Sequence, residues 1–147
     1  MRIAMACDHG GFALKEILKA YLTKKGYAVD DYGCHSTESM DYPDTAFPAA
    51  EAVAAHRADR GILICTTGIG MSVCANKVKG IRCALCTDTE SARLTREHND
   101  TNILALGAKN VSTEKAEEIA DIWLTTPFSG AERHARRVNK ITEYENK

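Results

Sequence analysis

The chain of 147 residues has almost no net charge, no long apolar segment and no internal repeat. Its formal charge of −1 creates no general field for nucleic acid or an anionic membrane, so we expect neither as a partner. None of its apolar runs approaches the roughly 20 residues that a membrane-spanning helix requires. Residues 1–6 lead directly into an apolar strand, without the features of a signal peptide, so we expect a cytoplasmic protein.

The composition is that of an ordinary globular protein. Hydrophobic residues make up 44% of the chain and charged residues 27%. A chain of this length can bury about two-thirds of the surface that it exposes when unfolded. Because no linker or low-complexity tract divides it, we expect residues 1–147 to form one domain.

Cysteine is the residue type that raises the question of cross-links and metals. The six cysteines are Cys7, Cys34, Cys65, Cys74, Cys83 and Cys86. They could form three disulfides, but four of them lie within apolar runs of a chain that we expect inside the cell, so we interpret all six as free thiols. Residues 83–86 match C-x-x-C, yet side chains three apart in a strand point to opposite faces. We therefore expect no metal site.

Short apolar runs alternate with helical patterns along the whole chain. The expected strands cover residues 2–7, 27–32, 61–65, 81–86 and 102–107. Between them, apolar side chains recur at helical spacing, as Leu14, Leu18 and Leu22 do. Strands that alternate with helices form parallel sheets with right-handed crossovers. The sequence therefore predicts an α/β fold with a doubly wound sheet of five parallel strands.

Three of the remaining segments are less regular. Residues 34–44 are polar, lack a period and contain Pro43, so we expect a loop of roughly ten residues, a length that is often functional. Asp88 is expected to be the N-cap of a helix, and residues 98–100 are expected to interrupt the helical pattern. The C-terminal segment 131–147 is helical in pattern but poor in apolar residues. We expect this helix to pack on a partner subunit.

The most distinctive stretch of the chain covers residues 61–77. An unbroken apolar run ends at Cys65, and a glycine turn and a helix start follow it. Gly68 and Gly70 remove Cβ bulk, so an anion can approach peptide N–H groups that a helix start leaves unpaired. Open α/β sheets bind their ligands at the carboxyl ends of the strands, where this thiol lies. The alternatives are a turn without a ligand and an inert buried cysteine.

Other candidate residues follow the ends of predicted elements. Asp8 and His9 follow the first strand as Cys65 follows the third, so these side chains can converge on one crevice. Alternatively, Asp8 is a helix N-cap and His9 lies at the surface. The alternative for His98 is a cation that a helix C-terminus favours.

A cluster of cations stands out near the C-terminus. Residues 133–137 hold three arginines and a histidine, and at helical spacing Arg133 and Arg137 share a face. A solvated helix face is the usual meaning of such a run. Arginine forks nevertheless match the geometry of phosphate, and the chain has little net charge elsewhere.

Several uncommon strings occur in a characteristic order. They are residues 7–12 (CDHGGF), 41–44 (DYPD), 61–72 (GILICTTGIGMS), 76–77 (NK), 96–100 (REHND) and Arg133-His134 with Arg137. Together they resemble type B ribose-5-phosphate isomerase, from Ile3 to about Ile141. The wider family includes isomerases of allose 6-phosphate and galactose 6-phosphate. The resemblance implies a single Rossmann-like (flavodoxin-like) domain of three layers and a homodimer, with a dimer of dimers as the alternative. It implies no metal and no nucleotide cofactor.

The resemblance also implies a reaction, in which D-ribose 5-phosphate and D-ribulose 5-phosphate interconvert through a cis-enediolate. Cys65 would be the base that moves a proton between C2 and C1 of the open-chain sugar. Backbone N–H groups of one turn would hold the developing oxyanion, and its residues are Gly68, Ile69, Gly70, Met71 and Ser72. Thr67 and His98 would assist ring opening, with His98 reaching in from the other subunit.

The same resemblance implies how the sugar phosphate is bound. Asp8 would bind sugar hydroxyls, and Asn99 would contact the substrate near O1. His9, Arg133 and Arg137 would hold the phosphate, with the arginines crossing the dimer interface.

The chain departs from the family pattern at two places, and other functions remain open. Thr66 stands where the family commonly has glycine, and residues 129–132 are longer than the usual segment before the Arg-His pair. The allose and galactose phosphates are alternative substrates. A nucleotide-binding module is a further alternative, although Gly68 and Gly70 lack the G-x-G-x-x-G spacing. A non-catalytic scaffold with the same fold is the last.

Overall fold

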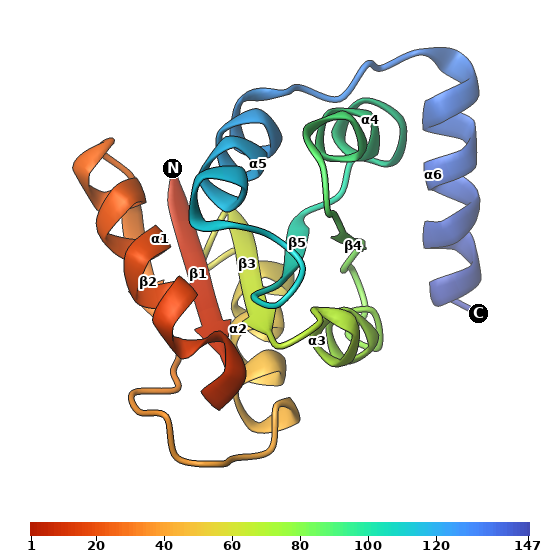
Figure 1. Cartoon of the computed structure of the whole chain (residues 1–147). Helices are drawn as coiled ribbons and strands as arrows, with labels where there is room; N and C mark the ends of the chain where they lie inside the picture. Colours follow the sequence, from red (N-terminus) through yellow and green to blue (C-terminus); the bar gives the residue numbers. More distant parts are fainter.

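The computed structural model describes residues 1–147 and places one parallel sheet between two layers of helices (Figure 1). The strands are β1 (Arg2–Cys7), β2 (Ala28–Asp31), β3 (Arg60–Cys65), β4 (Cys83–Leu85) and β5 (Ile103–Gly107). The helices are α1 (Phe12–Lys24), α2 (Pro43–Ala54), α3 (Ile69–Ala75), α4 (Thr89–Asn99), α5 (Thr113–Thr125) and α6 (Glu132–Glu145). A short 3-10 turn, His9–Gly11, precedes α1. This arrangement confirms the predicted fold class.

The strand order is β2-β1-β3-β5-β4, and all neighbouring strands are parallel. In a right-handed crossover, the direction of the step across the sheet decides which face the helix covers. Steps from β1 to β2 and from β4 to β5 run one way, and α1 and α4 lie on one face together with α5. The opposite steps place α2 and α3 on the other face. The chain reverses direction between β1 and β3, which is where open sheets of this type bind ligands.

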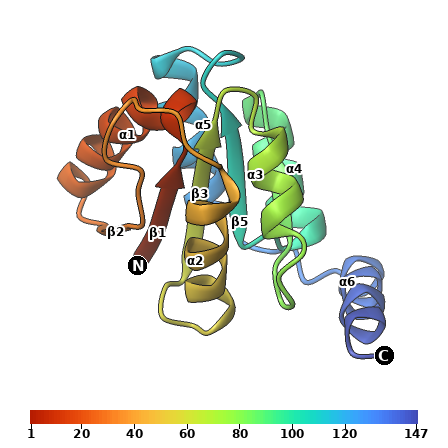
Figure 2. The ribbon, with the colours of Figure 1, turned by 90° about the horizontal axis from the view of Figure 1, so that it is seen from below.

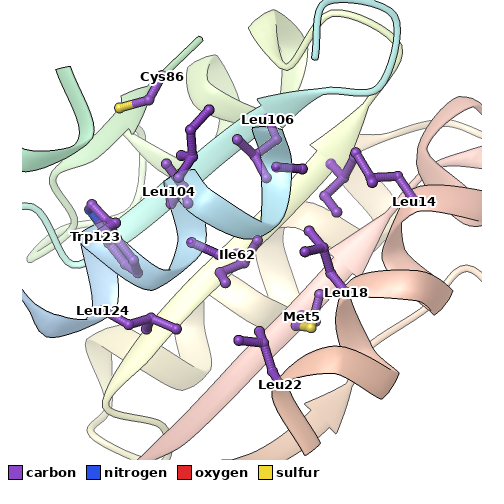
Figure 3. Packing of buried hydrophobic residues seen from close by; sticks show 14 of the residues in the cluster. Met5, Leu14, Leu18, Leu22, Ile62, Cys86, Leu104, Leu106, Trp123 and Leu124 are labelled. Carbon is purple, nitrogen blue, oxygen red and sulfur yellow. The ribbon is translucent and has the colours of Figure 1, made fainter. Parts of the chain in front are cut away.

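The two faces of the sheet bury different kinds of side chain. On one face, Leu14, Leu18 and Leu22 of α1 point toward Met5 of β1 and Ile62 of β3 (Figure 3). On the other face, alanines of α2 pack directly on the sheet, so this helix lies close to the strands. No helix in the chain combines the length and apolar character that crossing a membrane requires.

Some boundaries differ from the sequence prediction. The loop expected to run to residue 44 ends earlier, because Pro43 is the first residue of α2, where its fixed φ suits a helix start. The predicted interruption at 98–100 was also placed too early. His98 and Asn99 are the last two residues of α4, and Asp100, which has φ +46, is its C-cap. Asp88 caps this helix as predicted, since its side chain accepts a hydrogen bond from the N–H of Ser91.

Strand β4 is at the edge of the sheet and has only three residues, fewer than the predicted 81–86. A side chain from the end of α3 lies along it. Asn76 Nδ2 donates to the carbonyl of Cys83 at 3.0 Å, and Asn76 Oδ1 accepts from the N–H of Cys83 at 2.8 Å. These two bonds fix the edge strand to the helix that begins at the candidate site.

Helix α6 stands apart from the other helices and packs mainly on α4 (Figures 1 and 2). His134, its one buried residue, anchors its first turn, and Glu145 accepts a hydrogen bond from the N–H of Gly80 at 3.2 Å near its last. Between these points lies a groove of about 870 Å³. Ile141 and Tyr144 line it from α6 and are 46% and 74% exposed. The C-terminal helix therefore leaves an apolar surface uncovered within its own chain.

Candidate active site

Cys65 is the last residue of β3 and is buried at the reversal point of the sheet. Its Sγ accepts a hydrogen bond from the N–H of Gly68 at 3.1 Å. The structure thus places the thiol where the sequence predicted it, with a donor on its sulfur.

The glycine turn after Cys65 leaves two amides without a hydrogen-bond partner in the chain. Ile69 N–H donates to Thr67 Oγ1 at 3.3 Å, and Ser72 N–H donates to the carbonyl of Gly68 at 3.0 Å. The N–H groups of Gly70 and Met71 lie in the first turn of α3 and make no hydrogen bond within the chain. Of the five residues predicted to hold an oxyanion, these two have free donors.

Gly68 is required by both backbone angle and space. Its φ of +76 is in the left-handed region, and a Cβ there would lie 2.5 Å from Leu85 Cδ1 and 2.8 Å from the carbonyl carbon of Leu106. Gly80 has a similar φ of +91, but a Cβ there would meet nothing within 4 Å. A comparison of substitutions at Gly68 and Gly80 therefore distinguishes the cost of backbone strain from the cost of steric overlap.

We expect Gly68→Ala to lower the free energy of unfolding by roughly 2–5 kcal/mol, from left-handed strain plus overpacking. Gly80→Ala should cost about 1–2 kcal/mol, from strain alone. Urea unfolding of both variants measures the difference. Equal losses would show that the strands around Gly68 move aside at no cost.

Asp8 and His9 lie beside Cys65, as their places in the sequence predicted. Cys7 is paired in register with Ile64, so Asp8 is level with Cys65 on the neighbouring strand. Asp8 Oδ1 accepts from the N–H groups of Gly10 and Gly11, so this residue caps the 3-10 turn before α1. Its Oδ2 makes no hydrogen bond within the chain and remains available to a ligand.

His9 is exposed at the same edge of the sheet, and its Nδ1 accepts from the N–H of Met40 at 3.2 Å. This bond connects β1 to the loop before α2 and leaves Nε2 without a partner in the chain. Because Nδ1 accepts, Nε2 carries the proton and can donate a hydrogen bond to a ligand above the strand ends.

The departure at Thr66 fits the local backbone. Thr66 is not among the residues with positive φ, so its position does not require glycine. Its Oγ1 packs against Gly10, where a Cβ would overlap it. The carbonyl of Thr66 accepts from the N–H of Lys109 at 2.9 Å, which connects the turn to the end of β5. The threonine thus leaves the position of Cys65 intact.

Tyr42 contributes to the site, although the sequence analysis gave it no role. A Cβ on Gly70 would lie 2.8 Å from the Tyr42 ring, so the ring rests on the glycine turn. Tyr42 ends the loop that also contacts His9. Its place in the string DYPD was the available signal, but only the fold shows that this string reaches α3.

Four other predicted residues lie at the opposite edge of the sheet. Helix α4 starts at the carboxyl end of β4 and returns toward the amino end of β5, so His98 and Asn99 lie far from Cys65 in the same chain. Arg133 and Arg137 are on α6, at the end of the molecule opposite the tips of β1 and β3 (Figure 2). One chain therefore does not bring these residues together with the thiol.

The two arginines are exposed and make no salt bridge or hydrogen bond. By contrast, Arg136 is paired with Glu132 at 2.8 Å. Arg133 and Arg137 share a helix face, as predicted, and their guanidinium groups are free to bind an anion.

His134 connects this cluster to His98. The two histidine rings pack with their centroids 4.3 Å apart, and His134 Nδ1 is 2.7 Å from Ser129 Oγ. Desolvation, the Arg133 cation and His98 together lower the pKa of His134 below its ordinary value of 6.5. The sequence showed His134 as part of an Arg-His pair. That its ring packs on the ring of His98 was not predicted.

The lowered pKa of His134 predicts a stability that depends on pH. The neutral ring is favoured in the fold, so its contribution is fully present above the unfolded pKa and is lost as pH falls toward the folded pKa. We expect the thermal midpoint to fall between about pH 7.5 and about pH 5.5, and to fall less in His134→Gln. Parallel melts of both proteins measure this. Equal pH dependence would assign the effect to other groups.

No group of three or more His, Cys, Asp or Glu side chains is arranged to hold a metal ion. A buried thiol, two amides without partners and a carboxylate lie together at the carboxyl edge of the sheet, where α/β proteins of this class carry their small-molecule sites. The model of the Ribose/Galactose Isomerase family matches residues 3–141, and the chain belongs to this family.

Named relatives agree with this assignment. Ribose-5-phosphate isomerase B of Escherichia coli is 47% identical over 146 residues, which cover 99% of this chain and 97% of that protein. D-erythrulose-4-phosphate isomerase of Pectobacterium atrosepticum is 43% identical over 147 residues, covering 99% and 96%. The structure of ribose-5-phosphate isomerase B from Clostridium thermocellum is 52% identical, with a TM-score of 0.97 over 99% of this chain and 98% of that one. The protein is therefore a sugar phosphate isomerase.

Proposed function

We propose that this isomerase interconverts D-ribose 5-phosphate and D-ribulose 5-phosphate, a reaction of pentose phosphate metabolism. The observation that carries the proposal is Cys65 Sγ beside a turn whose Gly70 and Met71 amides are free. A carbon acid next to a carbonyl loses its proton at neutral pH only if a base is close and the enediolate charge is stabilised. The thiol meets the first condition and the amides meet the second.

We propose that the reaction proceeds in the following steps. Thr67 and His98 assist the opening of the sugar ring, and Cys65 then removes the proton at C2 of the open-chain sugar. The oxyanion of the cis-enediolate accepts hydrogen bonds from the turn at residues 68–72. Cys65 returns the proton to C1 while a proton moves from the C2 hydroxyl to the C1 oxygen, which gives the ketose.

A complete site needs a second copy of the chain. His98, Asn99 and the free arginines lie at the edge of the sheet away from Cys65, so we propose that they serve the site of a partner subunit. The exposed apolar residues that such an interface would cover are Ile69, Val73, Leu85, Ile141 and Tyr144. We therefore propose a homodimer, or a dimer of dimers, with shared active sites.

A mixing experiment tests the shared site. Cys65→Ser lacks the base, and the double variant Arg133→Ala/Arg137→Ala lacks the phosphate ligands. If each site takes residues from both subunits, a mixed dimer has one intact site and one site with both defects. After random subunit exchange, about one quarter of the wild-type activity should return. Activity no greater than the sum of the two variants would contradict the shared site.

The identity of the sugar requires a direct assay. Relatives include a protein named for a four-carbon sugar phosphate, and the family name includes galactose. One carbon unit changes discrimination by only about 1–3 kcal/mol when a pocket selects by size. We expect kcat/KM to be highest for ribose 5-phosphate among ribose 5-phosphate, erythrulose 4-phosphate, allose 6-phosphate and galactose 6-phosphate. A higher value for any of the others would reassign the substrate.

A further inference from the structure

Two of the six free thiols lie next to each other beside the candidate site. Cys7 Sγ and Cys34 Sγ are 3.5 Å apart, and no other pair of thiols in the chain is within hydrogen-bond distance. Cys7 ends β1 and is buried, while Cys34 begins the loop after β2 and is half-buried. The pair therefore has one reachable thiol and one protected thiol.

The backbone holds these two residues together independently of their side chains. Cys7 N–H donates to the carbonyl of Gly33 at 2.6 Å, and Cys34 N–H donates to the carbonyl of Cys7 at 2.9 Å. Thr45 Oγ1 also donates to the carbonyl of Cys7 at 2.8 Å. Because main-chain bonds hold the two residues side by side, a small adjustment of the side chains and the adjoining backbone brings the sulfurs into bonding distance.

A buried cation lies next to the pair. The Lys15 side chain is fully buried, and its Nζ donates to the carbonyl of Cys34 at 2.6 Å and to Asp31 at 2.7 Å. The thiolate is the reactive form of cysteine. Burial and the hydrogen bond with Cys34 raise the pKa of Cys7 to about 12, against the Lys15 charge. Cys34 is therefore the thiol that reacts first.

We propose that Cys7 and Cys34 form a reversible disulfide that controls sugar phosphate binding at the adjacent site. The Cys34 thiolate attacks a low-molecular-weight disulfide, which forms a mixed disulfide and releases one small thiolate. Cys7 then loses its proton to solvent, and its sulfur displaces the second small thiolate from Cys34. The two protein thiols are oxidised by two electrons, and the small disulfide is reduced to two thiols.

The effect on the site follows from what adjoins each cysteine. Forming the bond shortens the distance between the sulfurs from 3.5 Å to about 2.05 Å. Cys7 directly precedes Asp8 and His9, and Cys34 begins the loop that donates the Met40 N–H to His9. Displacement of these groups relative to Cys65 raises KM. This consequence, unlike the disulfide itself, rests on the proposed function.

The test compares reduced protein with protein equilibrated in oxidised glutathione. After free thiols are blocked, trypsin should release residues 3–15 joined to residues 26–57, since each of these peptides has one cysteine. We expect KM for ribose 5-phosphate to rise about tenfold and to return on reduction, because misplacement by about 1 Å can cost up to 10²-fold. Cys34→Ser should show neither change, and Cys83→Ser, which keeps the pair, should show both.

Each outcome decides a part of the proposal. Absence of the joined peptide in the wild-type protein overturns the disulfide, and this readout needs no variant. A joined peptide with an unchanged KM overturns the control of binding. A rise in KM that persists in Cys34→Ser, or in Cys34→Ala if the serine variant does not fold, assigns the effect to another thiol and also overturns it. If the reduced enzyme isomerises no sugar phosphate, the proposed function fails, and the peptide map alone decides the disulfide.

Discussion

Replacing Cys65 with serine is expected to lower kcat by about 10²–10⁴-fold, because loss of a positioned base typically costs this much. Serine has nearly the same shape and can still accept the hydrogen bond from Gly68 N–H, so the turn should keep its geometry. Its hydroxyl does not ionise near neutral pH and cannot replace the thiolate. Steady-state kinetics with ribose 5-phosphate, together with a thermal melt, measure the two effects separately.

The matched control for this variant is Cys74→Ser. Cys74 is also buried, lies on α3 in the same hydrophobic cluster as Cys65, and has a pKa that burial and Cys65 raise. It has no catalytic role in the proposed mechanism, so its replacement should change kcat little. If Cys65→Ser keeps a kcat close to that of the wild type, Cys65 is not the base. Asp8, with its free Oδ2, would then be the first candidate.

The double replacement Arg133→Ala/Arg137→Ala is expected to raise KM for the sugar phosphate by about 10²-fold or more. A hydrogen bond to a charged group contributes about 1.5–3 kcal/mol, and two guanidinium groups are removed. Neither arginine has a partner within the chain, so the fold should lose little stability. Initial rates over a range of ribose 5-phosphate concentrations give KM, and thermal melts check the fold.

Arg136→Ala is the control on the same helix. Arg136 is also exposed, but it is already paired with Glu132, and such surface pairs contribute about 0–1 kcal/mol. It removes one positive charge from the same helix and should leave KM unchanged. An unchanged KM in the double variant would return Arg133 and Arg137 to the class of solvated surface charges. A similar rise in the double variant and in Arg136→Ala would indicate a general electrostatic effect.

The elements of the fold were predictable because their signals are local. The apolar run at 61–65, the glycine turn and the helical spacing in α1 each depend on neighbours in the sequence. Strand order was not predictable in the same way. That β5 lies between β3 and β4 depends on contacts between residues far apart in the chain, which periodicity does not record.

The candidate site also has a part that local sequence signals predict and a part that depends on contacts between distant segments. Cys65, Asp8 and His9 could be placed together because the carboxyl ends of parallel strands meet at one edge of a sheet. The contact of Tyr42 with Gly70 could not be predicted, since it depends on the path of an irregular loop. The packing of His134 on His98 was missed for a related reason, because it depends on the docking of α6 on α4.

The bonds between Asn76 and the edge strand β4 have a consequence for association between molecules. An open edge with unpaired N–H and C=O groups is a template on which a strand of another chain can assemble, and this is a common route to aggregation. Here the amide of Asn76 occupies both backbone groups of Cys83, in a strand of only three residues. Continuous strand pairing across this edge is therefore blocked, and molecules that meet on this side must do so through their side chains.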